Sequence, residues 1–238
     1  MNKVKMQSKS IAIIPARGGS KRIPRKNIKP FLSVPIIRYS IDAALQSNCF
    51  DEVMVSTDDQ EIADFAMTCG AKIPFFRSEK SSNDFASTID VLEEVIDEYR
   101  KNGDEFTYLC CIYPTAPFIN AEKLRNGMDL LIKTGADCVL PVSRFSYPIQ
   151  RSLKIEDGKV FMIWPENYPA RSQDLMPAYH DCGQFYLLRT QSMLEQKSLY
   201  PENTIPIITS SLEVQDIDNE EDWLIAEMKY RLLKKIGI

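Results

Sequence analysis

Short apolar runs alternate with segments of helical periodicity between residues 11 and 142, and this alternation constrains the fold more than any other feature. The runs have the length and apolar content of buried strands and lie at 11–15, 53–56, 73–76, 108–112 and 138–142. Predicted helices follow the first four runs, at 36–46, 61–69, 87–101 and 121–134. Such a pattern indicates βαβ units, and hence an α/β fold with a mostly parallel sheet that binds ligands beyond the carboxyl ends of its strands.

The segment 143–182 interrupts this alternation. It is rich in proline, tyrosine and arginine, and its Asp157-Gly158 pair predicts a hairpin over 153–162. We expect an insertion that covers a site or contacts a second subunit. The remaining predicted elements are a strand at 184–188 and a helix at 219–235. The whole chain, 1–238, is therefore predicted to be one domain with an insertion.

Positive charge is concentrated in one loop. Residues 17–29 hold six cations and no acid, in a chain whose net charge is −4. Without that loop the chain has 23 basic and 33 acidic side chains. A compact cationic loop on an acidic body fits a small anion, whereas a nucleic-acid binder usually spreads its positive charge over a face. A solvated surface loop is the alternative.

The cysteines and the single histidine argue against several kinds of site. The six cysteines contain no C-x-x-C pair and His180 is the one histidine, so neither a structural zinc site nor a His₃ metal site is expected. No G-x-S-x-G elbow accompanies His180, which argues against a serine hydrolase. No apolar run approaches the roughly 20 residues of a membrane span, and we expect a cytoplasmic protein.

The cationic loop begins with Arg17-Gly18-Gly19-Ser20-Lys21, directly after the first predicted strand. Two glycines allow backbone N–H groups to approach an anion closely, and the flanking cations neutralise phosphate oxygens. The spacing matches neither G-x-x-x-x-G-K-[ST] nor G-x-G-x-x-G, so this is neither a P-loop nor a dinucleotide fingerprint. The pattern predicts a phosphate-binding loop.

From this loop onward the sequence resembles the cytidylyltransferases that activate nonulosonic acids, the CMP-sialic acid synthetase family. The principal matching motif is IIPARGGSKRIPRKN at 13–27. Further matches are STDD at 56–59, Arg77 with Asn83-Asp84, PTAP at 114–117 and GQFY at 183–186. The motifs most like the pseudaminic acid branch are YPIQR at 147–151, RSQDL at 171–175 and HDCGQFY at 180–186. The resemblance implies a Rossmann-like nucleotidyltransferase fold, with the insertion serving dimerisation and the sugar site.

The resemblance also implies which residues hold CTP. Those at the triphosphate and its ribose are Arg17, Gly18, Gly19, Ser20, Lys21, Lys26 and Asn27. Those toward the cytosine and its ribose are Arg77, Ser87 and Thr88. A surface salt bridge is the alternative for Arg77, and helix capping is the alternative for the Ser87-Thr88 pair.

Two alternating carboxylates, Asp216 and Asp218, form the candidate metal site. In an extended segment residues i and i+2 share a face, so both can address one Mg²⁺, and the family places its metal-binding aspartates here. Asp218 also fits the N-cap of the last predicted helix, either in place of the metal-binding role or in addition to it. Asp58, after the second predicted strand, is either a helix N-cap or a contact to a ribose hydroxyl or a metal-bound water.

Five residues are candidates for the sugar site. Tyr113 stands where sialic acid enzymes of the family usually carry glutamine, which disfavours sialic acid and suits a different nine-carbon acid. Gln184 matches a sugar-contacting segment, with an interior strand glutamine as the alternative. Arg151 and Arg171 are both candidates for the sugar carboxylate, which arginine binds bidentately. His180 is a sugar contact or a structural residue rather than a base.

The implied reaction joins CTP to the anomeric hydroxyl of a nonulosonic acid, pseudaminic acid by preference, and releases pyrophosphate. It would serve surface-glycan or flagellin glycosylation. Lys21 would stabilise charge on the phosphates, Arg17 would hold the pyrophosphate, and Asp216 or a metal-bound hydroxide would accept the proton. We expect a homodimer, as in the family, and no nucleic-acid or membrane partner. The alternatives are another CTP-dependent synthetase, acting on sialic, legionaminic or an eight-carbon keto acid, and a non-catalytic nucleotide or RNA binder.

Overall fold

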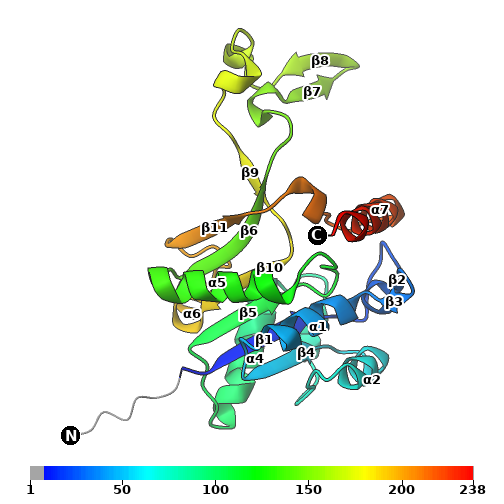
Figure 1. The fold of residues 1–238 in the computed structure, drawn as a ribbon, viewed down its shortest axis with the longest axis vertical. Coiled ribbons are helices and arrows are strands. Elements are labelled where there is room, and N and C mark those ends of the chain that lie inside the picture. The colour runs from blue at the N-terminus through cyan, green and yellow to red at the C-terminus, as the bar shows by residue number, and fades with distance from the viewer. Residues whose placement is uncertain (1–7, 238) are drawn as a thin grey trace, which may run out of the picture.

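The computed structural model describes residues 8–237. Its centre is a seven-stranded sheet with the order β11-β6-β10-β5-β1-β4, and β9 pairs with β6 (Figure 1). The strands are β1 (Ser10–Pro15), β4 (Glu52–Ser56), β5 (Tyr108–Ile112), β6 (Cys138–Arg144), β9 (Tyr179–Asp181), β10 (Phe185–Arg189) and β11 (Thr204–Ile208). β1 runs parallel to β4 and β5, and β6 runs parallel to β11, whereas β10 is antiparallel to both β5 and β6. The predicted α/β fold with a mostly parallel sheet is confirmed.

Both faces of the sheet are covered because its strands carry apolar side chains on both sides. Ala12 and Ile14 of β1 pack toward one layer of helices and Ile11 and Ile13 toward the other, and all four are fully buried. The first layer, in front of the sheet in Figure 1, holds α1 (Ile37–Ser47), α2 (Gln60–Thr68) and α5 (Ala121–Thr134). The second layer holds α4 (Thr88–Lys101) and α6 (Thr190–Gln196). Across residues 8–237, no helix has the length and composition of a membrane span.

A third apolar cluster joins the loop after β1 to the C-terminal helix, α7 (Glu220–Ile236). Phe31 meets Trp223 and Tyr230 of α7 edge to face, with ring centroids 5.7 and 5.6 Å away. The short elements around it are η1 (Lys26–Ile28), β2 (Pro30–Phe31) and β3 (Val34–Pro35). The cluster therefore holds the cationic loop against the segment that leads into α7.

The predicted insertion 143–182 begins in β6 and ends after β9, which pair with each other in the sheet, and residues 145–178 between them form an arm that stands away from it (Figure 1). The predicted hairpin is confirmed as β7 (Leu153–Glu156) and β8 (Lys159–Met162), with Asp157 and Gly158 both at positive φ in the turn. Several large apolar side chains on the hairpin are exposed, namely Leu153, Ile155, Val160 and Phe161. Exposed apolar patches of this kind are typical of interaction sites.

The predicted strand at 73–76 is wrong. Beside β4 the chain pairs only at Lys72, whose N–H donates to the Val53 carbonyl and whose carbonyl accepts from the Val55 N–H. Pro74, which has no N–H to donate, follows two residues later, and the segment leaves the sheet. β9, α6 and β11 are short and have no counterpart among the predicted elements.

The six cysteines are free thiols, and four of them are buried. Burial raises the pKa of the Cys138 and Cys182 thiols to about 12. A thiol with so high a pKa is a poor nucleophile, so these cysteines act as small core side chains.

Candidate functional site

A cavity of about 390 Å³ opens where β1 and β5 end. It is lined by the cationic loop after β1 and by the turn after β5. The lining residues are Pro15, Arg17, Ser20, Lys21, Arg22, Lys26, Asn27, Tyr113, Pro114 and Thr115. Four cations converge on one hollow, an arrangement that suits a polyphosphate. The structure thus brings together most of the loop residues predicted to hold the triphosphate.

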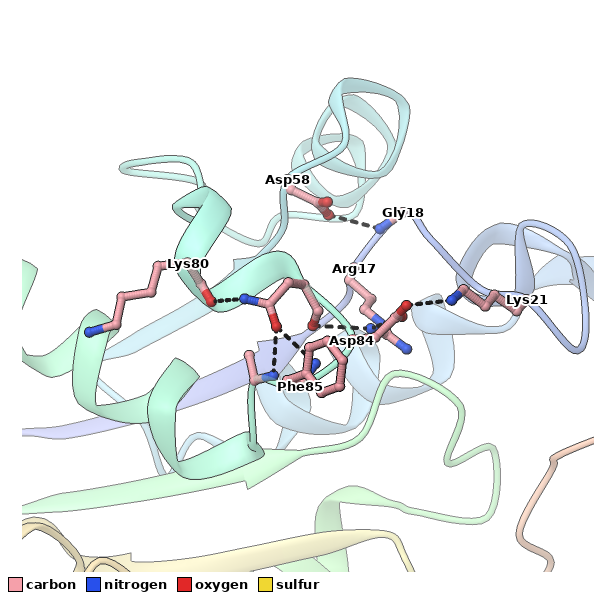
Figure 2. A network of polar contacts seen from close by, with 9 residues as sticks. Arg17, Gly18, Lys21, Asp58, Lys80, Asp84 and Phe85 are labelled. Atoms are coloured by element: carbon pink, nitrogen blue, oxygen red, sulfur yellow. Dashed lines mark hydrogen bonds and ion pairs between the residues drawn. The ribbon is translucent and has the colours of Figure 1, made fainter.

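Arg17 and Lys21 share one counter-ion, Asp84 (Figure 2). Arg17 Nη1 donates to Asp84 Oδ1 at 3.0 Å, and Lys21 Nζ donates to Asp84 Oδ2. These two cations, Lys21 above all, lower the pKa of the Asp84 carboxyl. Asn83 shapes the turn, because its Oδ1 accepts from the Phe85 N–H at 2.8 Å. Asp84 therefore neutralises the two cations that are predicted to meet phosphate.

Replacing Asp84 with asparagine is expected to tighten metal-free CTP binding by roughly two- to five-fold, the range expected for exposed ion pairs. The neutral amide releases Arg17 and Lys21 while preserving the size of the side chain. Titration calorimetry measures the dissociation constant, and Asp129→Asn, at an exposed position on α5, is the matched control. An unchanged constant for Asp84→Asn would show that this carboxylate does not compete with phosphate.

Gly18 lies tightly against the loop that follows β4. Its N–H donates to Asp58 Oδ1 at 2.8 Å (Figure 2). A Cβ on Gly18 would lie only 2.7 Å from Asp59 Oδ2 and 2.9 Å from Asp59 Cβ, so this position requires glycine. A Cβ on Gly19 would meet nothing within 4 Å. The Gly18 N–H is thus engaged by a carboxylate, and the glycine serves the packing of the loop.

Of the two alternatives for Asp58, the helix N-cap is wrong because the next residue caps α2. Asp59 Oδ1 accepts from the Ile62 N–H at 3.0 Å. Asp59 also pairs with Arg25 at 2.5 Å, and this hydrogen-bonded guanidinium lowers the pKa of the Asp59 carboxyl. Asp58 and Asp59 together attach the cationic loop to the end of β4.

Gly18→Ala is expected to lower the melting temperature by about 5 °C. Overpacking costs roughly 1–3 kcal/mol, and a chain of this length loses roughly 2–4 °C per kcal/mol. Differential scanning calorimetry measures the change. The neighbouring Gly19→Ala has free space and should leave the melting temperature unaltered. Equal shifts in the two variants would contradict the close approach of Gly18 to Asp59.

Two further residues predicted to contact the nucleotide also hold the loop in place. Asn27 is 7% exposed, and its Nδ2 donates to the Arg17 carbonyl at 2.9 Å. Lys26 Nζ donates to the Ile217 carbonyl at 2.7 Å, which joins the loop to the segment of the C-terminal aspartates. Burial lowers the pKa of Lys26, and the carboxylates of those aspartates act against this shift. Both side chains line the cavity as well.

Asp216 and Asp218 lie on the extended chain before α7. Burial raises the pKa of the Asp216 carboxyl, and the nearby Asp218 carboxylate raises it further. Asp218 Oδ2 pairs with Arg22 at 2.7 Å, which ties it to the cationic loop. The N-cap alternative for Asp218 is wrong, because Asn219 caps α7 by accepting from the Asp222 N–H at 3.0 Å.

The two aspartates suit a magnesium ion that is bound jointly with a nucleotide. Among residues 8–237 no group of three or more His, Cys, Asp and Glu side chains could hold a metal by itself. Mg²⁺ usually takes one or two carboxylates together with substrate phosphates rather than a cage made entirely of protein ligands. A divalent cation would also relieve the repulsion that raises the pKa of Asp216. The residues present therefore fit this ion.

A smaller cavity of about 200 Å³ adjoins the loop beside α4. Its lining includes the predicted contacts Arg17, Arg77, Ser87, Thr88 and Tyr113. Arg77 is 8% exposed and donates to Ser56 Oγ at 3.0 Å and to the Ser56 carbonyl at 2.6 Å, so it is not a surface salt bridge. Ser87 caps α4 in a capping box, and Thr88 Oγ1 lies 3.4 Å from the Tyr113 hydroxyl. The structure thus brings together the three residues predicted to lie toward the cytosine and its ribose, Arg77, Ser87 and Thr88.

A third cavity, of about 430 Å³, lies between the base of the arm and the segment of Asp216. His180 lines this cavity together with Asp216. The imidazole packs edge to face on Phe145 with centroids 4.9 Å apart, and its Nδ1 lies 2.8 Å from the Asp181 carbonyl. His180 is thus held by its neighbours and lines the same cavity as Asp216.

The other predicted sugar residues do not reach these three cavities. Gln184 is 3% exposed and donates from Nε2 to the Glu213 carbonyl at 2.6 Å, so it is an interior residue, although it lies just before β10 and not in a strand. Arg151 and Arg171 lie in the arm, where Arg151 donates to the Ala170 carbonyl. Within one chain, neither arginine lines a cavity beside the cationic loop.

A family model described as cytidylyltransferase matches residues 11–161, more than half of the chain. The chain belongs to the cytidylyltransferase family. The pseudaminic acid cytidylyltransferase of Campylobacter jejuni is 40% identical over 94% of this chain and 97% of that protein. The CMP-N,N'-diacetyllegionaminic acid synthase of Legionella pneumophila is 34% identical over 91% of this chain and 94% of that protein.

A solved structure supports the fold of this cytidylyltransferase. CMP:2-keto-3-deoxy-manno-octonic acid synthetase complexed with CTP has a TM-score of 0.68 at 19% sequence identity. The alignment covers 96% of this chain and 100% of that one. At this identity the likeness concerns the fold alone, and it confirms the predicted Rossmann-like nucleotidyltransferase architecture.

Three residues of this cytidylyltransferase shape the site without having been predicted to do so. Asp84 belongs to a recognised motif, but its contact with Lys21 spans 63 positions and no local pattern marks it. Arg144 and Lys229 line the cavity that holds Asp216. Lys229 could have been found, because it follows buried Ala226 by three positions on the inward face of a predicted helix.

Proposed function

We propose that this cytidylyltransferase transfers the cytidylyl group of CTP to a nonulosonic acid, pseudaminic acid by preference, and releases pyrophosphate. The observation that carries the proposal is the meeting of four loop cations in one cavity, from which Lys26 also reaches the carbonyl of Ile217, the residue after Asp216. The relative named for pseudaminic acid has the higher identity, 40% against 34%. Such a product is a donor for surface-glycan or flagellin glycosylation. Free thiols and a CTP substrate favour the cytoplasm.

In the proposed complex the triphosphate lies in the cavity of about 390 Å³. Lys21 stabilises the charge that develops on the phosphates, and Arg17 holds the pyrophosphate that leaves. Both cations exchange Asp84 for phosphate when CTP binds. The cytosine and its ribose occupy the adjoining cavity beside Arg77 and Thr88.

We assign Mg²⁺ to Asp216 and Asp218 in the presence of the phosphates. The ion would neutralise phosphate charge and polarise the α-phosphoryl group. Asp216 is also our candidate for the group that accepts the anomeric proton. Asp216 lines the cavity proposed for the sugar, so its carboxylate would face the anomeric hydroxyl.

The acidic sugar is proposed to lie in the cavity of about 430 Å³, with His180 on one side and Asp216 on the other. The exposed apolar hairpin favours a homodimer formed through the arm. In that assembly the arm of one subunit would approach the site of the other. Arg151 or Arg171 would then be available to bind the sugar carboxylate, although within one chain neither lines the cavity proposed for the sugar.

The proposed function is tested by pyrophosphate release in the presence of CTP, Mg²⁺ and one acid at a time. Pseudaminic, legionaminic and sialic acids, and an eight-carbon keto acid, are compared at equal concentrations. Release with pseudaminic acid at the highest kcat/KM is the expected result. Faster turnover of another acid would reassign the substrate. Binding of many polyanions with strong salt dependence, and no release with any acid, would favour the non-catalytic binder.

Charging the exposed hairpin is expected to separate a dimer into monomers. Ile155 and Val160 face each other across β7 and β8 and are 75% and 60% exposed. Ile155→Asp combined with Val160→Asp would force two charges into the interface, which is strongly unfavourable. Sedimentation equilibrium measures the mass. Leu224→Asp, at a 57% exposed position on α7, is the control, and a monomeric unmodified protein would contradict the proposed dimer.

A further inference from the structure

The proposed metal-binding aspartates lie on a segment that belongs to no sheet. Residues 211–219 make one short turn, η5 (Ser211–Glu213), and then run extended to α7. In the described part of the chain the segment has no strand partner. Metal affinity depends on how well the carboxylates are held. Hydrogen bonds from side chains must therefore hold this segment in place, as hydrogen bonds between strands do within a sheet.

Lys229 of α7 makes three such contacts. Its Nζ donates to the carbonyls of Ser211 at 3.1 Å and Val214 at 2.7 Å, and to Gln215 Oε1 at 3.1 Å. These bonds use all three hydrogens of the ammonium group. Burial alone lowers the pKa of Lys229, and no carboxylate acts against that shift. All the donors of a partly buried cation are thus directed at one short segment.

Gln215 connects Lys229 to both aspartates. Lysine has no acceptor, so its ammonium fixes the Oε1 of Gln215 toward itself and directs Nε2 away. That Nε2 donates to the Asp216 carbonyl at 3.1 Å and to Asp222 Oδ1 at 3.3 Å. The other oxygen, Asp222 Oδ2, accepts from the Asp218 N–H at 3.0 Å. A continuous set of hydrogen bonds therefore runs from α7 to the backbone of each aspartate.

We propose that Lys229 is a positioning residue for the metal-binding aspartates, acting through Gln215 and Asp222. The inference rests on the proposed function, in which Asp216 and Asp218 hold Mg²⁺ together with the phosphates. Residues that orient metal ligands typically contribute 10–100-fold to metal affinity or activity. Lys229 lines the cavity proposed for the sugar, but it neither contacts the cationic loop nor lines the cavity proposed for the triphosphate. Its loss should therefore weaken metal–nucleotide binding and leave metal-free CTP binding intact.

The test compares Lys229→Met, which keeps the aliphatic stem and removes the donors, with Lys235→Met at an exposed position on the same helix. Water-proton relaxation measures binding of the Mn²⁺–CTP complex, and calorimetry measures binding of CTP without metal. Hydrogen exchange follows the amides of 211–219 in the metal-free protein. For Lys229→Met we expect about 10-fold weaker Mn²⁺–CTP binding, faster exchange in that segment and unchanged metal-free CTP binding. Its Mg²⁺ half-saturation should rise about 10-fold, with kcat recovering at saturating Mg²⁺.

Unchanged Mn²⁺–CTP binding in folded Lys229→Met would overturn the proposal, as would equal weakening of CTP binding with and without metal. Gln215→Leu removes the connection while leaving the ammonium, and it should reproduce the metal defect. Should Lys229→Met fail to fold, Gln215→Leu decides the question by the same measurements. If the unmodified protein released no pyrophosphate, the proposed function would fail, whereas the exchange and Mn²⁺ results would still test the positioning.

Discussion

Lys21→Ala is expected to lower kcat by about 10²–10³-fold, the usual loss when one preorganised donor to a developing negative charge is removed. Lys21 lines the triphosphate cavity with its side chain 75% exposed, and its partner Asp84 is an exposed carboxylate. Removing the lysine should therefore leave the melting temperature nearly unchanged, because exposed ion pairs contribute little to stability. Single-turnover measurement of pyrophosphate release gives the rate of the chemical step.

Lys80→Ala is the control for this variant, because Lys80 is an exposed lysine near the same turn and no ion pair is formed by its side chain among the described residues (Figure 2). It should retain the normal rate. A near-normal rate for Lys21→Ala would remove the charge-stabilising role from Lys21. A higher KM for CTP with an unchanged kcat would show that Lys21 contributes equally to binding of the ground state and the transition state.

Asp216→Asn is expected to lower kcat by at least about 10²-fold at any Mg²⁺ concentration, because it removes a metal ligand and the candidate proton acceptor together. The melting temperature should hold or rise. The raised pKa of Asp216 means that folding disfavours its ionised form, so at neutral pH the charged carboxylate opposes stability above its folded-state pKa. The neutral amide abolishes that cost.

Stability and activity should thus move in opposite directions for Asp216→Asn, which thermal denaturation and pyrophosphate release measure on the same sample. Asp222→Asn is the informative companion, because Asp222 accepts from the backbone of Asp218 and Asn219 and its loss should lower the melting temperature. Normal turnover by Asp216→Asn would rule out both proposed roles of this carboxylate.

The parts of the fold that could be predicted from the sequence are those that depend on local periodicity and turn residues. The buried strand before Arg17 and the hairpin at Asp157-Gly158 are confirmed, because apolar period and turn chemistry act over a few residues. The segment 73–76 misled because apolar content alone does not reveal whether a strand finds a partner. The antiparallel direction of β10 was equally hidden, since it depends on where the arm returns to the sheet.

The candidate site divides in the same way. The cationic loop and Asp216 could be proposed from the sequence because their residue types, their spacing and the family resemblance mark them, and the structure places both at cavities. Asp84 was missed because its partner Lys21 lies 63 positions away in the chain. Lys229 was missed because its partners lie on an irregular loop, whose course has no periodic sequence pattern. The helix-cap alternatives for Asp58 and Asp218 were each wrong by one position, since adjacent Asp and Asn residues are chemically equivalent candidates for the cap.

Three contacts between the cationic loop and the C-terminal segment determine when the nascent chain can complete this site. Arg22 meets Asp218, Lys26 meets the Ile217 carbonyl and Lys29 meets Glu220, the last two across 191 positions. When the ribosome reaches residue 210, the residues of every described strand of the central sheet have been synthesised. The three partners of the loop, which lie at 217–220, have not. Acquisition of nucleotide binding should therefore wait for synthesis of residues 217–220, after all the strands of the sheet have been synthesised.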